Sequence, residues 1–234
     1  MKQGKYSQKF ENTVSIISAA SVAGKKEGDG PLGTLFDHVE EDPQFGQDNW
    51  EAAESQMQKM AADIALEKAG ISRGQIRYLL GGDLLGQNIA TSFGLMELDL
   101  PVFGLYGACS TMGESLNLGS MLMDGRMADY LLCVTSSHFA TAEKQFRFPL
   151  EYGNQRPLSA TWTVTGAAAV LLGNQGGIAR IAGVTPGKIV DFGVRDSMNM
   201  GAAMAPADGI IGPLQSPSYL PEKGERTFDS CIKM

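Results

Sequence analysis

Short apolar runs alternate with segments of helical spacing along most of the chain, a pattern typical of a sheet covered by helices. The first run, residues 14–23, predicts a buried strand. A long helix is predicted from its cap at Asn49 to about Lys68, and Gly70 supplies the C-terminal stop. The apolar residues of this helix fall three and four positions apart and predict one buried stripe, formed by Ala53, Met57, Met60, Ala61 and Ile64.

The same pattern continues through the rest of the chain. It predicts strands at Ile76–Leu80, Pro101–Tyr106, Asp129–Ser136 and Thr161–Leu172, and helices at Asn88–Glu97 and Ser110–Asp124. Alternation of strand and helix predicts parallel β-α-β units in a layered α/β fold. No helical pattern separates the last two strands, so Thr161–Leu172 is predicted to be antiparallel. Segments 24–48 and 141–157 are predicted as loops, and residues 178–194 as further strand.

Composition and charge exclude several classes of protein. Of the 234 residues, 43% are hydrophobic and 19% are charged, which is enough for one large globular domain. The formal net charge of −7 argues against a nucleic-acid binder, which needs a basic surface to displace phosphate counterions. No run approaches the roughly 20 apolar residues of a membrane-spanning helix. Glu11 and Asn12 interrupt the basic start of the chain, so a strand fits residues 14–23 better than a signal peptide does.

The three cysteines are an odd number and lack metal-ligand spacing. They therefore predict neither a disulfide framework nor a zinc site, and a reducing cytoplasmic compartment fits them best. One of them, Cys133, lies inside the apolar run 131–134 and is predicted to be part of the core.

The sharpest local feature is the sequence GACST at residues 107–111, between a predicted buried strand and a predicted helix. Small residues permit a tight turn that lifts the side chain of Cys109 above the edge of the sheet. The positive end of the helix dipole stabilises a thiolate there, and backbone N–H groups can hold a carboxylate or an oxyanion. A small buried cysteine that fills a tight turn explains the same residues equally well.

A histidine follows the next predicted strand, in the sequence SSH at residues 136–138. Ligands of open α/β folds gather at the carboxyl ends of strands, so His138 and Cys109 are predicted to share one pocket. A thiol nucleophile needs its base within hydrogen-bond reach. A hydrogen-bonded structural histidine is the simpler alternative. The other histidine, His38, lies in the acidic segment 37–42, which is predicted to be a solvated loop and not a metal site.

The segment 141–157 places basic residues close to aromatic ones. Lys144, Arg147 and Arg156 are its cations. Arginine beside aromatic rings suits a flat anionic ligand, which can be stacked and held by charge-assisted hydrogen bonds. Ion pairing with neighbouring glutamates on a surface loop is the alternative.

Six segments, in order along the chain, resemble the stage V sporulation protein AD family: DGPLGTLFD, GGDLLGQN, GACSTMGES, TSSHFATAEKQFRFPLEYG, TVTGAAAVLL and DSMNMGAAMAPA. Several ordered motifs are far more specific than one short pattern. The family resembles thiolases, with two related β-α-β-α-β-α-β-β halves packed as α-β-α-β-α layers. The resemblance implies one thiolase-like N-terminal half at residues 1–206. A divergent tail containing prolines follows at residues 207–234 and is expected to be extended.

The resemblance also implies a function: binding of dipicolinic acid (pyridine-2,6-dicarboxylate) and its uptake into the developing bacterial spore. It implies partners among the other stage V sporulation A proteins, and a location on the cytoplasmic face of the spore inner membrane. Cys109 and His138 match the family's GACS and SSH motifs and are the leading ligand-binding candidates, followed by Lys144 and Arg147 in the KQFR segment. No metal site or cofactor of the chain's own is implied, although calcium would accompany dipicolinate.

Some positions depart from the family pattern. Met112 and Gly113 stand where the family reads Ser-Met, and Phe139 stands where Asn is usual, which can alter the wall beside His138. The sequence after Ala207 resembles nothing in the family, so a truncated chain is expected. Catalysis on the thiolase scaffold draws on both halves. An acyltransferase of the thiolase or ketoacyl-synthase type, with Cys109 as nucleophile and coenzyme A as carrier, is the alternative function. An inactive fragment is the third.

A missing half would leave an apolar surface without its partner, so the chain is expected to self-associate. The helix after Cys109 is the predicted main contributor, because its apolar residues spread around more than one face: Met112, Leu116, Met121, Leu122 and Met123.

Overall fold

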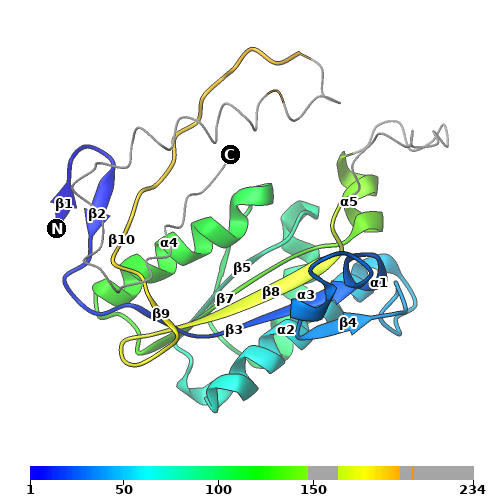
Figure 1. The fold of residues 1–234 in the computed structure, drawn as a ribbon, viewed down its shortest axis with the longest axis horizontal. Helices are drawn as coiled ribbons and strands as arrows, with labels where there is room; N and C mark the ends of the chain where they lie inside the picture. Colours follow the sequence, from blue (N-terminus) through cyan, green and yellow to red (C-terminus); the bar gives the residue numbers. More distant parts are fainter. Residues whose placement is uncertain (147–162, 196–201, 203–234) are drawn as a thin grey trace.

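The computed structural model describes residues 1–146, 163–195 and 202, and Figure 1 draws the rest as a thin grey trace. A seven-stranded mixed sheet forms its centre, in the order β4-β3-β8-β7-β5-β6, with β9 paired to β3. Its strands are β3 (Ser15–Gly24), β4 (His38–Glu40), β5 (Tyr78–Gly82), β6 (Val102–Gly104), β7 (Tyr130–Ser137), β8 (Gly166–Gly173) and β9 (Ala179–Arg180). A small second sheet contains β1 (Lys2–Gln3), β2 (Ser7–Lys9) and β10 (Gly183–Val184).

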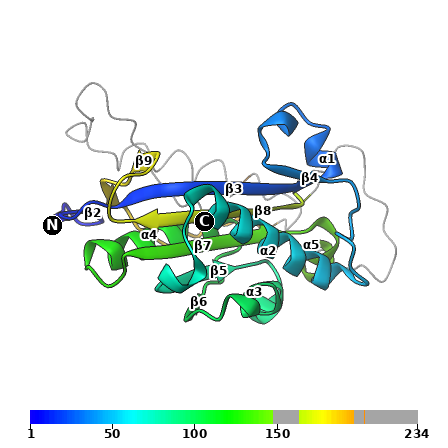
Figure 2. The same ribbon diagram turned by 90° about the horizontal axis from the view of Figure 1, so that it is seen from below.

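Helices cover both faces of the central sheet (Figures 1 and 2). The long helix α2 (Trp50–Ala69) packs with α3 (Ile89–Leu95) on one face, and α4 (Thr111–Asp124) lies on the other. The remaining α-helices of the described residues are α1 (Lys25–Gly28) and α5 (Phe139–Phe146). Within the described residues, no helix is long and apolar enough to cross a membrane.

Strand β7 shows how the two layers are built, because successive side chains of a strand point to opposite faces. Leu132 and Val134 pack into the core beneath α2, whereas Leu131 and Cys133 pack beneath α4. The side chain of Cys133 is fully buried, and this burial raises the pKa of its thiol to about 12. The prediction that Cys133 belongs to the core is therefore confirmed.

The predicted sheet is confirmed strand by strand. Segments 76–80, 101–106, 129–136 and 161–172 overlap with β5, β6, β7 and β8, which all belong to one sheet, and β5, β7 and β8 end one or two residues later than predicted. Strand β5 runs parallel to both of its neighbours, β6 and β7. Strand β8 runs antiparallel to β3 and β7, as predicted from the missing helix before it. The succession β3-α2-β5-α3-β6-α4-β7-β8 is the β-α-β-α-β-α-β-β order of one thiolase-like half, and the fold is a thiolase-like α/β fold.

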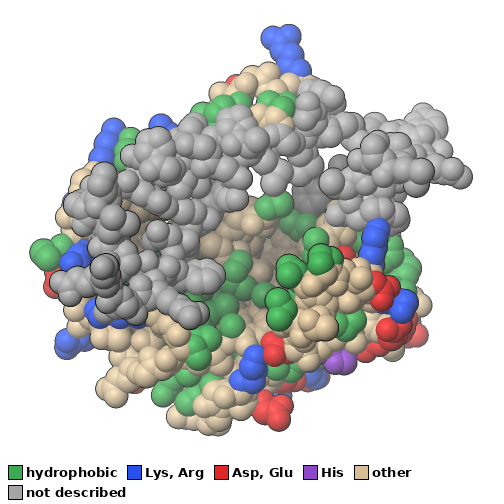
Figure 3. All heavy atoms as spheres, in the orientation of Figure 1, with side chains coloured by type: hydrophobic (Ala, Val, Ile, Leu, Met, Phe, Trp, Pro, Cys, Tyr) green, Lys and Arg blue, Asp and Glu red, His purple; other side chains and the backbone are tan. Residues whose placement is uncertain are grey.

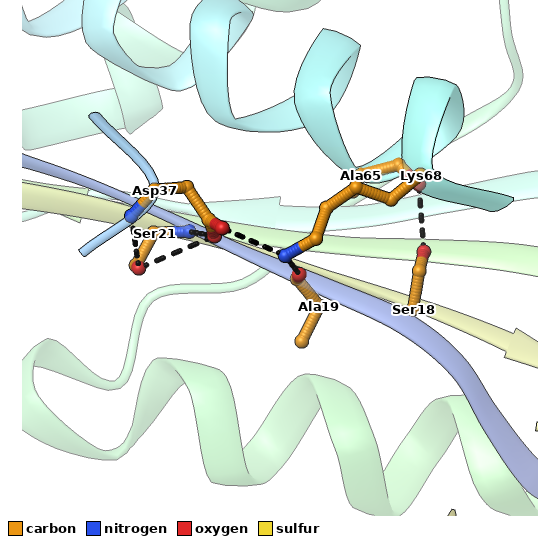
Figure 4. Close-up of polar contacts among 6 residues, drawn as sticks. All are labelled: Ser18, Ala19, Ser21, Asp37, Ala65 and Lys68. Atoms are coloured by element: carbon orange, nitrogen blue, oxygen red, sulfur yellow. Dashed lines mark hydrogen bonds and ion pairs between the residues drawn. The ribbon is translucent and has the colours of Figure 1, made fainter. Parts of the chain in front are cut away.

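Polar groups fix the position of α2 over the sheet. Asn49 caps its first turn by accepting a 2.8 Å hydrogen bond from the amide of Ala52, and Gly70 ends it in the left-handed conformation. Lys68, in the last turn, donates to the carbonyl oxygen of Ala19 at 2.7 Å and to the carboxylate of Asp37 at 2.8 Å (Figure 4). This arrangement occupies part of the edge of β3 that β4 leaves uncovered.

Three segments differ from their predictions. The predicted loop 24–48 contains α1, a short 3₁₀ turn and β4, whose pairing with β3 is a tertiary contact that local sequence does not reveal. The predicted strand 178–194 contains only the short strands β9 and β10. After Val184, Pro186 lacks an N–H donor and Gly187 weakens a strand, so the extension ends there. The predicted loop 141–157 begins inside helix α5, and its residues from 147 onward lie outside the described part, as does the tail 207–234.

Candidate functional site

The carboxyl ends of β5, β6 and β7 lie at the same edge of the sheet. These strands are parallel, and they end at Gly82, Gly104 and Ser137. From β5 the chain moves outward through α3 to β6, and from β6 it returns through α4 to β7 on the other side of β5. Because α3 and α4 lie on opposite faces, the ends of β5 and β7 form a topological switch point, where open α/β sheets bind their ligands.

Cys109 lies in the turn that enters α4 from β6. Residues Ala108–Ser110 form a 3₁₀ turn immediately before the helix, and the cysteine is exposed. The turn is held internally: the Ser110 hydroxyl donates to the Gly107 carbonyl at 2.7 Å, and the Thr111 hydroxyl donates to the Ala108 carbonyl at 2.8 Å. The predicted position at the start of a helix is confirmed, and the alternative of a buried cysteine is excluded.

The glycines around this turn are required by close approaches. A side chain at Gly82 would place its Cβ 2.1 Å from the carbonyl oxygen of Leu105, so the end of β5 lies directly against the turn. A Cβ at Gly107 would lie 2.5 Å from the Ser110 hydroxyl and 2.7 Å from a carboxylate oxygen of Glu114. Ala108 adopts a φ of 48°, a left-handed conformation that costs a non-glycine residue about 1 kcal/mol. The turn is therefore a specialised structure.

His138 lies at the end of β7, directly before α5, with no exposed surface. Its Nε2–H donates to the carbonyl oxygen of Pro43 at 2.8 Å, and its Nδ1 accepts from the amide of Ala140 at 3.2 Å. The ring stacks on Phe139 at 4.9 Å between centroids and lies 5.5 Å from the ring of Trp50. Burial lowers the pKa of His138 below its ordinary value of 6.5, so the ring is neutral at neutral pH.

Both nitrogens of His138 are thus engaged in hydrogen bonds within the described structure. Neither is free to accept the proton of a thiol, which a general base for Cys109 would have to do. Two cavities, of about 350 and 420 Å³, are lined by other residues. A pocket shared by Cys109 and His138 therefore stays a prediction. Of the other candidates, Lys144 lies in α5 with its side chain outside the described part, and Arg147 and Arg156 lie wholly outside it.

A buried polar network lies beneath the same end of the sheet. The carboxylate of Glu54, in α2, accepts from the Ser136 hydroxyl at 2.7 Å and from the Thr141 hydroxyl at 2.5 Å. The side-chain amide of Gln58 donates to Ser136 at 2.7 Å and to Thr91 at 3.0 Å. The network thereby joins α2 to the end of β7, the start of α5 and the start of α3.

The far end of the network is a second buried carboxylate, Asp83, directly after β5. Its oxygens accept from the Leu85 amide at 2.8 Å, the Thr91 amide at 2.7 Å and the Thr91 hydroxyl at 2.6 Å. Asp83 therefore fixes the loop that leaves β5 at the candidate site. No cation pairs with Glu54 in the hydrogen bonds and ion pairs of the described residues.

Burial dominates the electrostatics of Glu54. Removal from water raises the pKa of its carboxyl to about 7, the hydrogen bonds from Thr141 and Ser136 oppose this rise, and the negative charges of Asp83 and Glu51 add to it. Near neutral pH the group therefore exchanges its proton. The Thr141 hydroxyl also lies 3.0 Å from the carbonyl oxygen of His138, so the network reaches the histidine.

Sequence reasoning did not identify Glu54, Gln58 or Asp83. One signal was present: Glu54 and Gln58 are one turn apart on α2 and flank Met57 of the predicted apolar stripe, so two polar side chains share the buried side of the helix. Asp83 carried a second signal, because it follows a buried strand directly. Their partners Ser136 and Thr141 are about 80 residues away, and only the folded chain brings them together.

Among the described residues, no group of three or more His, Cys, Asp or Glu side chains could hold a metal ion. His38, considered for such a site, lies in β4, where its Nε2 is 3.3 Å from Glu40.

Known proteins resemble the chain in sequence. A family model described as "Stage V sporulation protein AD" matches residues 4–216. Stage V sporulation protein AD of Bacillus subtilis (strain 168) is 45% identical over 204 residues, which cover 87% of this chain and 60% of that protein. The chain thus spans about 60% of the length of the curated relative it matches.

Solved structures overlap with parts of the chain. An OleA variant of Xanthomonas campestris with cerulenin is 18% identical, with a TM-score of 0.49, and the overlap covers 71% of this chain and 59% of that one. The 3-oxoacyl-(acyl carrier protein) synthase III of Xanthomonas oryzae pv. oryzae is 20% identical, with a TM-score of 0.46, and the overlap covers 71% of this chain and 57% of that one. A priming β-ketosynthase from the R1128 polyketide pathway is 15% identical, with a TM-score of 0.47, and the overlap covers 74% of this chain and 53% of that one. The fold assignment above rests on the order of the elements and not on these overlaps.

Proposed function

The chain belongs to the stage V sporulation protein AD family, and on this premise we propose that it binds dipicolinic acid and supports its uptake into the developing spore. The observation that carries the proposal is the family match over residues 4–216, which includes the turn around Cys109, the SSH sequence before α5 and the KQFR segment. The bound form is the dianion dipicolinate. Its flat ring and two carboxylates suit stacking and charge-assisted hydrogen bonds.

The proposed ligand site lies at the carboxyl ends of β5, β6 and β7. The exposed turn at Cys109 brings backbone N–H groups and the positive end of α4 to the edge of the sheet, which favours a carboxylate. Lys144 and Arg147, in and after α5, supply positive charge for the ligand. His138 shapes the wall beside α5, because its ring is buried and fixes the turn from which α5 begins.

The proposed partners and location rest on the same family membership. We propose that the protein acts with other stage V sporulation A proteins at the cytoplasmic face of the spore inner membrane, and that calcium accompanies dipicolinate as its counter-ion. The chain needs no further cofactor for this role.

An acyltransferase that uses Cys109 as nucleophile and coenzyme A as carrier is the second candidate. The exposure of Cys109 at the start of α4 favours it. The hydrogen bonds of His138 weigh against it, because they leave no ring nitrogen to take the thiol proton. We therefore place binding before catalysis.

Titration calorimetry with dipicolinate, with and without calcium, separates these functions when an acyl-coenzyme A thiolysis assay is run beside it. Picolinate, with one carboxylate, and benzene-1,3-dicarboxylate, without the ring nitrogen, are the control ligands. Binding of dipicolinate above both controls, without thiolysis, supports the proposal. Thiolysis that disappears in Cys109→Ser supports the acyltransferase, and the absence of both indicates an inactive chain.

We also propose that the chain self-associates, but through a different surface from the one predicted. On α4, Leu116 and Met123 are buried and the other apolar residues are half-buried, so this helix is not the main exposed surface. Figure 3 views the molecule from the side of β3 and α1, where hydrophobic and charged side chains are interspersed, whereas Figure 2 shows β6 at the opposite side of the sheet. On the last strand of the sheet, the apolar residues Val102 and Phe103 are exposed.

These two residues form the β6 edge patch. Strand β6 pairs only with β5 among the described strands, and Val102 and Phe103 on it are exposed. An edge strand with apolar side chains is a template for pairing with another chain. The edge strand on the other side, β4, carries His38 and Glu40 on either side of Val39, and all three residues are only partly exposed. Self-association is therefore proposed at β6.

A further inference from the structure

The carboxyl group of Glu54 connects the two ends of the turn that contains His138. One oxygen accepts from Ser136, two residues before the histidine, and the other accepts from Thr141, three residues after it. Glu54 belongs to α2, more than 80 residues earlier in the sequence. It therefore holds the end of β7 and the start of α5 together across the turn, while the ring of His138 hydrogen-bonds to Pro43 and Ala140 instead.

Proton counting gives this bridge two states. A threonine hydroxyl has one proton, yet Thr141 lies 2.5 Å from Glu54 Oε2 and 3.0 Å from the carbonyl oxygen of His138, and both atoms are acceptors when Glu54 is ionised. Ionised Glu54 takes the proton of Thr141, and the His138 carbonyl loses that donor. Protonated Glu54 donates to Thr141 instead, and the Thr141 proton then goes to the His138 carbonyl.

The surroundings of Glu54 favour exchange between these states near neutral pH. Ser136 from β7 and Thr141 from α5 supply uncharged hydroxyls. The charged groups that face it are Asp83, from the loop after β5, and Glu51, from α2, and both are acidic. His138 is the remaining titratable group of the turn, and its burial favours the neutral ring. Burial and negative neighbours together raise the pKa of Glu54 to about 7.

We propose that Glu54 is a positioning residue for the ligand site, whose protonation fixes the β7–α5 turn through Thr141 and strengthens the binding of dianionic ligands. This inference rests on the proposed binding of dipicolinate. Two effects have the same sign. The protonated state adds a hydrogen bond to the His138 carbonyl, and it removes a buried negative charge from beneath a site that receives an anion.

Glutamine tests the proposal because it imitates the protonated acid. Its amide oxygen accepts from Ser136 and its amide nitrogen donates to Thr141, so Glu54→Gln fixes the second state at every pH. Asp63→Asn is the matched control. It removes one negative charge from the same helix, but Asp63 is solvent-accessible and pairs with Arg73 at 3.4 Å. Thr141→Val removes the hydroxyl, and Thr141→Ser restores it.

The ligand readout is the affinity for dipicolinate between pH 6 and 8.5. Wild type and Asp63→Asn are expected to bind about tenfold more weakly at the upper end, a coupling of ordinary size between two sites. Glu54→Gln is expected to stay tight across the range. Thr141→Ser is expected to keep the pH dependence of the wild type, and Thr141→Val to lose most of it. A pH profile of Glu54→Gln that matches the wild type overturns the proposal.

A second readout needs no ligand. Trp50 lies 5.5 Å from the His138 ring, so its fluorescence reports on the turn when the other tryptophan is replaced by Trp162→Phe. A transition near pH 7 is expected with Glu54 and not with Glu54→Gln. If this transition is seen but dipicolinate binds nowhere, the proposed function fails and the positioning role stands. If dipicolinate binds and the transition is absent, the positioning role fails and the proposed function stands.

Discussion

The Nε2–H of His138 donates to the carbonyl oxygen of Pro43 at 2.8 Å, which joins the end of β7 to the loop before α2. The two residues are 95 positions apart, and the histidine is fully buried while the proline is at the surface. The proton of the neutral ring is on Nε2, because Nε2 donates to Pro43 and Nδ1 accepts from the Ala140 amide. His138 is therefore part of the framework of the candidate site, and its predicted effects concern stability first.

We expect His138→Ala to lower the free energy of unfolding by about 3 kcal/mol. The substitution leaves a cavity beside Trp50 and removes the partner of the partly buried Ala140 amide. His138→Gln retains a donor and an acceptor and is expected to lose less. Denaturant unfolding of the three proteins checks this, and equal stability of wild type and His138→Ala would contradict the framework role.

The contribution of His138 to the free energy of unfolding depends on pH. Burial lowers the pKa of His138 below its value in the unfolded chain, so its contribution to stability is present above about pH 6.5 and is lost as the pH falls. The stability difference between wild type and His138→Gln should therefore shift against the wild type below pH 6.5. Unfolding curves at pH 7.5 and 5.5 measure it.

Glu54 has the opposite effect on stability, which it lowers as the pH rises. Its pKa in the folded chain, about 7, lies above the ordinary glutamate value of 4.5, so the folded state holds the proton more tightly and loses stability as the pH rises between these values. Relative to Glu54→Gln, the wild type should lose about 3 kcal/mol between pH 4.5 and 7.5. Asp63→Asn should show no such trend. A constant difference between wild type and Glu54→Gln would mean that Glu54 titrates normally.

The edges of the sheet make a separate prediction. Lys68→Met should cost about 1 kcal/mol, because Lys68 bonds the Ala19 carbonyl and pairs with Asp37 in a partly exposed place. Thermal unfolding compares it with Lys5→Met, whose lysine lies near the turn between β1 and β2. If Lys68→Met and Lys5→Met unfold alike, Lys68 does not fix α2 on β3.

Self-association is checked by sedimentation of the purified chain over a hundredfold range of concentration. Val102→Lys places a charge on the β6 edge and should shift the protein toward monomer. Leu35→Lys is the control, since Leu35 is more exposed than Val102 and lies outside the β6 edge patch. A wild type that is monomeric at every concentration, or an equal effect of both substitutions, would exclude the patch.

The fold was predictable because the sequence pattern and the layer architecture agree. The cap at Asn49, the stop at Gly70 and the apolar runs each act locally, so the boundaries of α2 and the order of the strands follow from nearby residues. The antiparallel direction of β8 followed from a missing helix. Strand β4 was missed because its partner β3 supplies the hydrogen bonds, and local sequence carries no signal for that contact.

The candidate site was only partly predictable. The turn at Cys109 is a local structure, and small residues between strand and helix signalled it correctly. The state of His138 depends on Pro43, Trp50 and Phe139, and two of these are distant in sequence. The roles of Glu54 and Asp83 depend on burial, which a polar residue beside an apolar stripe signals only weakly.

The central claim is that this chain binds dipicolinate at the end of the sheet near Cys109. Titration calorimetry of the purified chain, beside Arg147→Gln and the charge-matched control Lys5→Gln, tests it most directly. We expect saturable binding of dipicolinate that exceeds that of picolinate and benzene-1,3-dicarboxylate, weakened at least about tenfold by Arg147→Gln and unchanged by Lys5→Gln. No binding, or equal binding of all three ligands by all three proteins, would contradict the claim.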